Sequence, residues 1–485
     1  MMGKFQEYQS FIQDNNNYSL LPFRFSRLDE DQVFLSNIAG QYLVLNNKNF
    51  DLFAKKKLEK NSELYNNLRT NHFLYDDLTE VNKKLLAIKY KTRINNLSDF
   101  TKLHMFVISL RCEHSCPYCQ VSRQSQDKQK FDMTKETADK AIDLVFQSPS
   151  KNIKIEFQGG EPLLNFEILK YIVLEAKARK PLEKNLDFVI ATNLALINDE
   201  ILDFCKLHGI NISTSLDGPK DLHNKNRPRP GNNSYEKAIE GIKKVKNALG
   251  PDAISALMTT TLESMDNIEA IIDEYIKNDF NGIFLRPLSP YGFAIKTKYY
   301  DKYSVENWIE FYKKGLKYIL DINKSRINFI EFYSTIILKK MLTFQTPGYV
   351  DLMSPAGTGI AAVVYNYDGS IYASDEGRML AENKDFTFKL GDVTQPYKDI
   401  FASDKLIDIL DQSYSKSAPM CSDCAFEDYC GSDPVYHYAT QKDYVGNKAH
   451  SDFCKRNMFL FKYLVKKMQE SKDTEKLFRF WATQC

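Results

Sequence analysis

Between residues 103 and 287 the sequence alternates apolar strand-like segments with amphipathic helical segments, and this rhythm limits the possible folds. The six expected strands cover residues 103–110, 152–158, 186–191, 211–215, 253–261 and 282–287. The segments between them carry apolar residues at helical spacing, as in FEILKYIVLEAKA. Strands that follow one another through helices form parallel sheets, because the helix supplies the return crossover. We therefore expect an α/β protein with either an open barrel or a doubly wound sheet.

Three cysteines, Cys112, Cys116 and Cys119, follow the first expected strand at spacings of three and two residues. They belong to nine cysteines, seven of which lie in two groups, a pattern typical of intracellular metal binding rather than of a secreted disulfide framework. Structural zinc sites and most iron–sulfur clusters use four protein ligands, so this group leaves one position for another ligand. Part of a zinc site is the alternative, although no fourth cysteine or histidine lies suitably near, since His114 is inside the motif.

Polar and glycine-rich motifs stand at the ends of other expected strands. They are GGEP at residues 159–162, ATN at 191–193, SLDGP at 215–219, and Arg286. Active sites of parallel barrels lie at the carboxyl-terminal ends of the strands. We therefore expect these motifs and the cysteine loop to share one rim, whereas GGEP alone would be an ordinary strand-to-turn signal.

A second cysteine group consists of Cys421, Cys424 and Cys430, with Cys454 further along the chain. It follows an expected hairpin at residues 363–374, which alternates around Asp368-Gly369. Four thiolates saturate a metal centre, so this site is closed. The spacing alone fits structural zinc as well as an iron–sulfur cluster.

These motifs together resemble the radical S-adenosylmethionine (radical SAM) enzymes, whose signature is three cysteines spaced as in the first group, with an aromatic residue, here Tyr118, before the third. The resemblance implies a partial (β/α)6 barrel over residues 101–330. Its three thiolates would hold a [4Fe–4S] cluster, and S-adenosylmethionine would fill the open position. Reductive cleavage of this molecule would yield a 5′-deoxyadenosyl radical.

The resemblance also implies how the rim binds S-adenosylmethionine. Gly159 and Gly160 would let the backbone approach the methionine part, and Glu161 would receive its ammonium group. The contacts expected with the carboxylate, ribose and adenine come from Thr192, Asn193, Ser215, Asp217, Arg227 and Arg286.

Residues 331–485 resemble the SPASM domain, which normally uses seven cysteines for two auxiliary clusters. Three of those positions here carry Ser354, Ser374 and Pro434, and all three belong to the first auxiliary cluster. The four cysteines of the second group remain, so the resemblance implies one auxiliary [4Fe–4S] cluster. Asp375 follows a lost cysteine position, where related sulfatase-maturing enzymes carry a general base; a solvated turn acid is the alternative.

Residues 1–100 are expected to form a small N-terminal α+β domain. Residues 24–47 suggest two or three short strands, and FDLFAKKKL and SELYNNLRT suggest helices. This domain would be a winged-helix element that pairs a leader peptide along a sheet edge, or a cap that stabilises the barrel.

The motifs LPFRFSRL, LRCEHSCPYCQVSRQ and YNYDGSIYASDEGRML resemble the His-Xaa-Ser system radical maturase B group. The resemblance implies oxidative modification, for example crosslinking, of a small precursor peptide, together with a second radical SAM enzyme and an electron donor protein. Two alternatives are oxidation of Ser or Cys to formylglycine, as in sulfatase maturases, and a non-catalytic iron–sulfur or zinc scaffold.

Charge and hydropathy narrow the setting further. The net charge of +2 provides no large basic field for nucleic acid. The start of the chain is polar and no apolar run approaches 18 residues, so we expect neither a secretory signal nor a membrane span. The expected location is cytoplasmic.

Overall fold

The computed structural model describes residues 18–76, 80–98, 100–121, 123–343, 345 and 348–484, and it is built around an eight-stranded sheet in the order β10-β9-β8-β7-β6-β13-β14-β15. Five neighbouring strands are parallel: β6 (Leu103–Ser109), β7 (Asn152–Gly159), β8 (Asn185–Thr192), β9 (Ile210–Ser215) and β10 (Ile254–Leu257). They match the first five expected strands. The α/β class and the parallel barrel sheet are thus confirmed.

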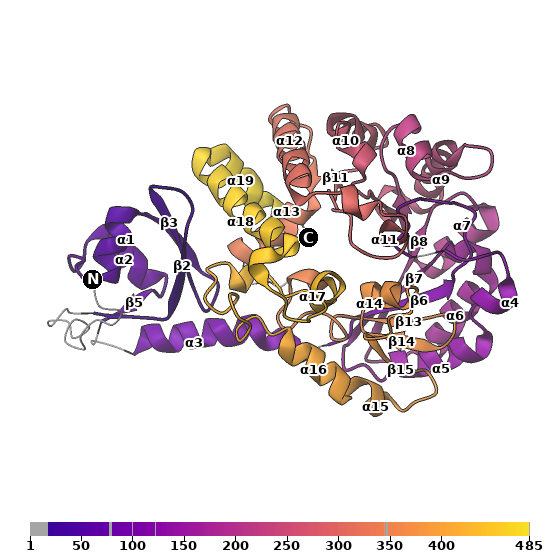
Figure 1. Ribbon diagram of the computed structural model, residues 1–485, viewed down its shortest axis with the longest axis horizontal. Helices are drawn as coiled ribbons and strands as arrows, with labels where there is room; N and C mark the ends of the chain where they lie inside the picture. Colours follow the sequence, from indigo (N-terminus) through magenta and orange to yellow (C-terminus); the bar gives the residue numbers. More distant parts are fainter. Residues whose placement is uncertain are drawn as a thin grey trace.

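Helices join these strands and lie on their outer side (Figure 1). The connecting helices are α5 (Lys135–Val145), α6 (Phe166–Arg179), α7 (Asp199–His208), α9 (Ser234–Leu249) and α10 (Ile268–Lys277), with the short α4 (Lys128–Phe131) and α8 (Lys220–Asn226). The boundaries follow from local chemistry in α7, where the Asn198 side chain accepts a hydrogen bond from Ile201 N. The same helix ends at Gly209 with φ +66°, a left-handed conformation that glycine adopts without strain.

The sixth strand is shorter than the sequence predicts. Only β11 (Gly282–Ile283) has regular pairing, and its partner is β12 (Ile330–Glu331) rather than β10. The predicted strand continues as irregular backbone, yet Thr260 N still donates to Arg286 O at 2.9 Å. Pro287 has no N–H to continue a ladder. Arg286 therefore stays at the rim although its strand is incomplete.

The C-terminal hairpin continues the barrel sheet. Strands β13 (Ala362–Tyr365) and β14 (Ser370–Tyr372) are antiparallel, which confirms the predicted hairpin, and β15 (Lys389–Asp392) pairs with β14. On its other side β13 pairs with β6 in parallel. This junction brings α14 (Asp375–Ala381) to the rim of the barrel.

The remaining helices pack beyond the barrel, and Trp308 and Trp481 are fully buried among them. They are α11 (Phe293–Lys296), α12 (Val305–Lys324), α13 (Phe332–Leu342), α15 (Tyr397–Phe401), α16 (Asp404–Gln412), α17 (Pro434–Gln441), α18 (Asp452–Glu470) and α19 (Lys472–Trp481). Cys454 lies in the first turn of α18, where Ser451 Oγ accepts from its N–H.

The N-terminal segment lies at one end of the molecule and forms a three-stranded sheet, β2-β3-β4, and a two-stranded sheet, β1-β5, with helices beside them (Figure 1). Its elements are β1 (Ser19–Leu20), β2 (Phe23–Arg27), β3 (Gln32–Asn37), β4 (Tyr42–Asn46), α1 (Asn47–Ala54), α2 (Glu63–Thr70), β5 (Leu74–Tyr75) and α3 (Val81–Ile94). The strands and the two helices expected before residue 71 are therefore present. Phe53, Tyr65 and Phe73 form the centre of its own small core.

This N-terminal sheet rests on the loop that carries the second cysteine group. Phe34 stacks on Phe426 with ring centroids 4.5 Å apart, and Ser36 Oγ donates to Ala425 O at 2.6 Å. Arg24 Nε donates to Ser422 O at 2.6 Å, and Tyr429 Oη donates to Gly40 O at 3.0 Å. Aromatic stacking and buried hydrogen bonds thus hold the N-terminal sheet against the C-terminal region.

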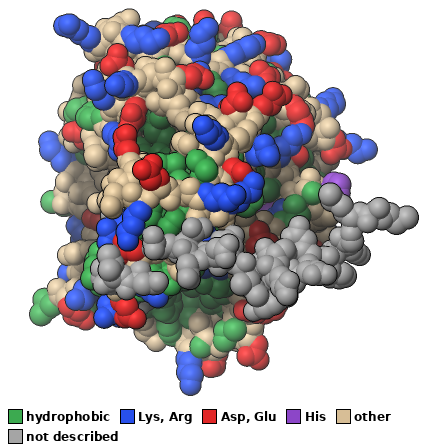
Figure 2. Space-filling model, turned by 90° about the vertical axis from the view of Figure 1, so that its left-hand side faces the viewer, with side chains coloured by type: hydrophobic (Ala, Val, Ile, Leu, Met, Phe, Trp, Pro, Cys, Tyr) green, Lys and Arg blue, Asp and Glu red, His purple; other side chains and the backbone are tan. Residues whose placement is uncertain are grey.

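The molecular face at the N-terminal end carries basic and acidic side chains intermixed (Figure 2). No single-sign field covers the part of that face that the structure describes. Within the described ranges, none of the helices has both the length and the apolar composition required to cross a bilayer.

Candidate active site

A cavity of about 280 Å³ lies at the carboxyl-terminal ends of the barrel strands. Its lining brings together twelve of the residues that the sequence singled out: Cys112, Cys116, Tyr118, Cys119, Gly159, Gly160, Thr192, Asn193, Ser215, Arg227, Arg286 and Asp375. Glu161 and Asp217 are fully buried and form hydrogen bonds to lining residues. The first cysteine group and the strand-end motifs therefore belong to one site.

Three segments hold the cysteine loop against the barrel. Arg111 forms a bidentate ion pair with Asp132, with both N···O distances at 2.7 Å. Cys119 O accepts from Phe293 N at 2.8 Å, and Ser115 N donates to Pro228 O at 2.8 Å. Burial raises the pKa of Cys116 to about 12, which keeps the thiol protonated until a metal cation displaces the proton.

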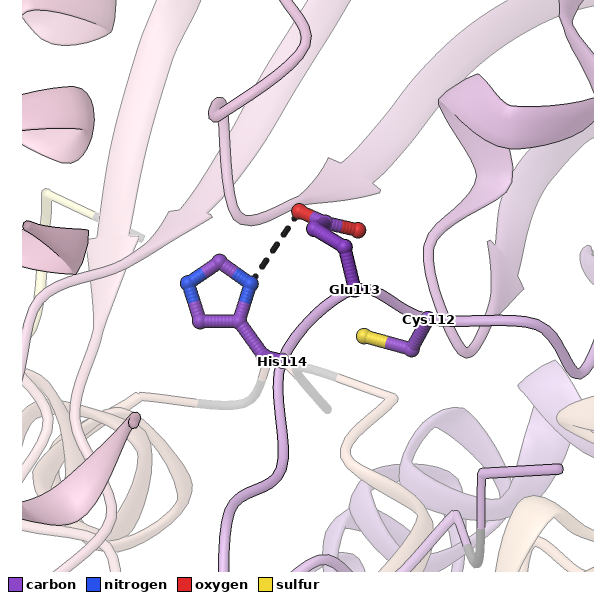
Figure 3. Close-up of side chains that lie close together, drawn as sticks. All are labelled: Cys112, Glu113 and His114. Carbon is purple, nitrogen blue, oxygen red and sulfur yellow. Dashed lines mark hydrogen bonds and ion pairs between the residues drawn. The ribbon is translucent and has the colours of Figure 1, made fainter. Parts of the chain in front are cut away.

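The residues after Cys112 form a compact group (Figure 3). Glu113 Oε1 lies 3.1 Å from His114 Nδ1, and Asn193 Nδ2 donates to the same Glu113 oxygen at 2.9 Å. Cysteine, histidine and acidic side chains can bind metal ions. Among the described residues, Cys112, Glu113 and His114 are the one group of three such side chains whose ligand atoms all lie within 4.8 Å of one another. Since Glu113 and Asn193 already contact His114 Nδ1, we interpret this trio as an anchor for the loop rather than as a separate metal site.

Glu161 organises the end of β8. Its carboxylate accepts from Thr192 Oγ1 at 2.7 Å, from Asn193 N at 2.9 Å and from Leu163 N at 3.1 Å. Burial, with a further contribution from Glu113, raises the pKa of Glu161 to about 8. A cationic group nearby would stabilise the ionised carboxylate.

Asp217 links two residues of the cavity wall. Its carboxylate accepts from Tyr118 Oη at 2.5 Å and from Arg227 Nε and Nη2 at 2.9 and 3.2 Å. Burial by itself would raise the pKa of Asp217, but the charges of Arg227 and His223 and the hydrogen bonds from Arg227 and Tyr118 together outweigh it and hold the pKa below its ordinary value. The wall therefore carries a fixed, ionised Asp–Arg pair with the Tyr118 ring beside it.

Gly159 and Gly160 allow β7 to approach the cysteine loop closely. A Cβ at Gly159, which has φ +149°, would stand 1.9 Å from Ser109 O, and one at Gly160 would stand 2.3 Å from Arg111 O. Only glycine fits such distances from another backbone. The close approach found here is thus to the chain itself, while an approach to S-adenosylmethionine stays a prediction.

Asp375 lines the same cavity, in the first turn of α14. Its Oδ1 accepts from Arg378 Nε at 3.1 Å, and Arg378 is almost completely buried. The side chain is therefore held at the cavity wall rather than turned toward bulk solvent as a loop acid would be.

Two polar residues of β7 were not predicted as part of the site. Glu156 and Gln158 line the cavity, and Gln158 Nε2 donates to Glu156 Oε1 at 2.6 Å. Burial raises the pKa of Glu156. Their neighbours Ile155 and Phe157 are fully buried on the other side of the strand. The sequence signal was the alternation of apolar and polar residues in IEFQ. Inward positions of a barrel strand are normally apolar, so polar residues at alternate positions indicate a site inside the barrel.

The second cysteine group lies around the start of α18, and Cys421, Cys424 and Cys454 each act electrostatically on Cys430. A tetrahedral zinc ion with Zn–S bonds near 2.3 Å would hold its sulfurs about 3.8 Å apart. Among the described residues, no three of these thiols lie within 4.8 Å of one another. Four thiols in one region can hold either a zinc ion or an iron–sulfur cluster.

Comparison with known proteins agrees with this geometry. The model of the radical SAM superfamily matches residues 106–275. The radical SAM cyclopropyl synthase TigE of Paramaledivibacter caminithermalis is 26% identical over 249 residues, which cover 48% of each chain. A cysteine-type anaerobic sulfatase-maturating enzyme of Clostridium perfringens is 25% identical over 283 residues, or 54% of this chain and 71% of that protein. The chain spans about half the length of the first curated relatives that it matches.

Solved structures share the fold. The structure of anSMEcpe with bound AdoMet has a TM-score of 0.61 at 18% identity, and covers 76% of this chain and 98% of its own. Streptococcus suis SuiB bound to the precursor peptide SuiA has a TM-score of 0.54 at 15% identity, and covers 90% of this chain and all of its own. At these identities the likeness establishes the fold, which extends through the C-terminal region.

Proposed function

The chain contains a radical SAM domain, and from this premise we propose that it is an enzyme that oxidatively modifies side chains of a small ribosomally made peptide. The observation that carries the proposal is the single cavity in which the three cysteines and Asp375 meet. A cavity at a barrel rim admits an extended peptide more readily than a folded protein.

The cavity fits a [4Fe–4S] cluster with S-adenosylmethionine. Three thiols line it, no other cysteine of the described residues does, and no three thiols converge closely enough for one metal ion. Its volume of about 280 Å³ is close to the lower end of ordinary small-molecule sites, roughly 300 Å³. When bound, this pair supplies a carbon radical that takes a hydrogen atom from the substrate.

The protein residues position the reactants. Asp217 fixes the Tyr118 ring and the Arg227 guanidinium, and Glu161 fixes Thr192 Oγ1 and Asn193 N. These groups would bind the cofactor without having to reorganise. Asp375 at the same wall would accept the proton that leaves an oxidised side chain.

The second cysteine group would hold one auxiliary [4Fe–4S] cluster. Four thiolates leave no position for substrate, so the role that fits this cluster is electron transfer. The electron released by substrate oxidation would pass to the auxiliary cluster and from there to the external electron-transfer protein.

The N-terminal domain would bind the leader part of the peptide. Strand β4 pairs only with β3 among the described residues, so one side of β4 is an edge to which a peptide strand can add. The alternative is a stabilising cap, and the contacts of Phe34 and Arg24 with the C-terminal loop fit either role.

The motifs that resemble the His-Xaa-Ser group support a finer proposal for the substrate. We propose a His-Xaa-Ser-type precursor peptide, with a second radical SAM enzyme acting on the same peptide. Solved structures with a similar fold include SuiB bound to its precursor peptide SuiA and anSMEcpe bound to a Cp18Cys peptide. These complexes support a peptide substrate.

Incubation of reconstituted enzyme with such a peptide, S-adenosylmethionine and a reductant under anaerobic conditions is expected to remove two hydrogen atoms from the peptide per event. Mass spectrometry measures the change, and an Asp375→Asn variant that retains S-adenosylmethionine cleavage should form less product. Unchanged peptide mass, with the partner enzyme both absent and present, would contradict the proposal. A product that reacts with a hydrazide probe would instead indicate the aldehyde of a formylglycine.

Replacement Glu161→Ala is expected to weaken S-adenosylmethionine binding about ten- to hundredfold, because a charge-assisted hydrogen bond contributes roughly 1.5–3 kcal/mol. Equilibrium binding to the reconstituted protein measures the loss. Glu167→Ala, which removes an exposed acid from the first turn of α6, is the matched control. Equal affinity of the Glu161 variant and the original protein would show that this carboxylate does not bind the cofactor.

A further inference from the structure

A second cavity lies beside the first, and Arg286 lines both. It is small, about 20 Å³, which is room for one group the size of a water molecule. Three acids and two bases from five segments line it: Asp351, Glu376, Asp433, Arg286 and Arg456. We call it the charged chamber. Its other walls are mostly aromatic, with Phe284, Tyr291, Tyr333, Tyr349 and Tyr436.

The charges of this chamber do not satisfy one another. No ion pair within 4.0 Å is found between these arginines and these acids, although the side chains of the rest of the described chain form many such pairs. Asp433 Oδ1 accepts a hydrogen bond from Tyr436 N and from no other described group. Asp433 is thereby the N-cap residue of α17. Arg286 and the three acids are half-buried and Arg456 is buried, so a bound partner would offset the cost of partly removing these unpaired charges from water.

Two nearly buried side chains also have a polar atom without a hydrogen-bond partner here. The Tyr291 side chain is 2% exposed and its hydroxyl has no hydrogen-bond partner, and Arg456 is 9% exposed with its Nε unpaired. Buried polar groups are nearly always hydrogen-bonded in folded proteins. The Tyr291 hydroxyl is thus available to a group inside the chamber.

The charge balance at alkaline pH favours a cation as the missing group. Once Glu376 and Asp433 are ionised, above about pH 8, the three carboxylates and two guanidiniums leave one net negative charge, and the tyrosine faces also favour a cation. No three acids here bring their oxygens within 4.8 Å of one another, whereas a divalent ion with oxygen ligands at about 2.0–2.6 Å requires such convergence. Guanidinium and imidazolium groups exceed the available volume.

We propose that the charged chamber binds a primary ammonium group, taken up from a lysine side chain or the amino terminus of the substrate peptide. Two of the carboxylates and the Tyr291 hydroxyl accept its three N–H bonds. The assignment of the ammonium to a peptide rests on the proposed function, whereas binding of an ammonium group as such does not.

The protonation of the acids agrees with this proposal. Burial and the nearby Asp351 charge raise the pKa of Glu376 to about 7 and that of Asp433 to about 8. An ammonium group binds the ionised forms. Its binding should therefore strengthen as the pH rises through this range, with Arg286 and Arg456 charged throughout.

The site is tested by measuring the thermal unfolding of the full chain in methylammonium chloride and, at the same ionic strength, in tetramethylammonium chloride. Methylammonium is expected to raise the unfolding temperature, and the bulkier cation should not. Above pH 8, where the Asp433 carboxylate is ionised, the variant Asp433→Asn should lose this response while becoming more stable without ligand, because one repulsive charge is gone. Tyr291→Phe should weaken the response about tenfold without loss of stability, since its hydroxyl has no protein partner.

Asp408→Asn, which removes an exposed acid of α16, is the control and should respond like the original protein. An equal response to both cations, or a full response in the Asp433 and Tyr291 variants, would overturn the binding site. Turnover of a lysine-bearing peptide with a free amino terminus should fall when both amines are acetylated. Equal turnover of the acetylated peptide would overturn the peptide assignment, even where methylammonium binds.

Discussion

Replacement of Cys112, Cys116 and Cys119 by alanine is expected to halve the iron bound per chain and to abolish cleavage of S-adenosylmethionine. The three thiols line the cavity at the barrel rim, whereas the second cysteine group lies near the start of α18 and would keep its own cluster. Iron analysis and detection of 5′-deoxyadenosine after anaerobic reconstitution measure both effects.

The control for this experiment is Cys205→Ala, which changes a buried thiol on α7 outside both groups. It should leave iron content and cleavage unchanged. Complete loss of iron in the triple variant would show that the second group holds no cluster. Zinc retained at Cys421, Cys424, Cys430 and Cys454 would lead to the same conclusion.

Replacement Asp217→Ala is expected to lower the free energy of unfolding by about 3–5 kcal/mol, because it leaves a buried charge without its partner. Asp217 is completely buried, and the Arg227 side chain that pairs with it is 15% exposed. The variant should also bind S-adenosylmethionine poorly, since Tyr118 and Arg227 lose the group that orients them. Chemical denaturation and equilibrium binding measure the two losses.

Asp221→Ala, an exposed acid on α8, is the matched control. The double variant Asp217→Ala with Arg227→Met should recover part of the lost stability, because no unpaired charge remains. A single variant as stable as the original protein would mean that water or another group compensates Arg227, contrary to the contacts described.

The barrel strands were predictable because their apolar runs recur between helices of ordinary length, and the cysteine motif then located the rim. Contacts between distant segments left no comparable signal. The pairing of β13 with β6 depends on which edge of the barrel sheet is free after folding. The sequences of the two strands do not indicate this edge. The irregular end of the sixth strand likewise depends on its pairing with β12.

Within the site, the residue types were predictable but several of their partners were not. Asp217 was expected to contact the cofactor, and the structure shows it bound to Tyr118 and Arg227. Glu156 and Gln158 were missed because a polar alternation on a strand resembles an exposed face. The charged chamber joins residues from Arg286 to Arg456, so only the fold brings its members together.

The attachment of the N-terminal sheet to the cysteine loop has a consequence for the length of the substrate. Phe34, Ser36 and Arg24 hold this sheet against the loop of the second cysteine group, so its separation from the barrel mouth varies less than it would on a flexible tether. An extended peptide advances about 3.3–3.6 Å per residue. If the leader of the peptide is bound at the β4 edge, the separation of the sheet from the barrel mouth sets the number of residues between the leader and the side chain that reaches the barrel. The modified position is then a fixed number of residues from the leader.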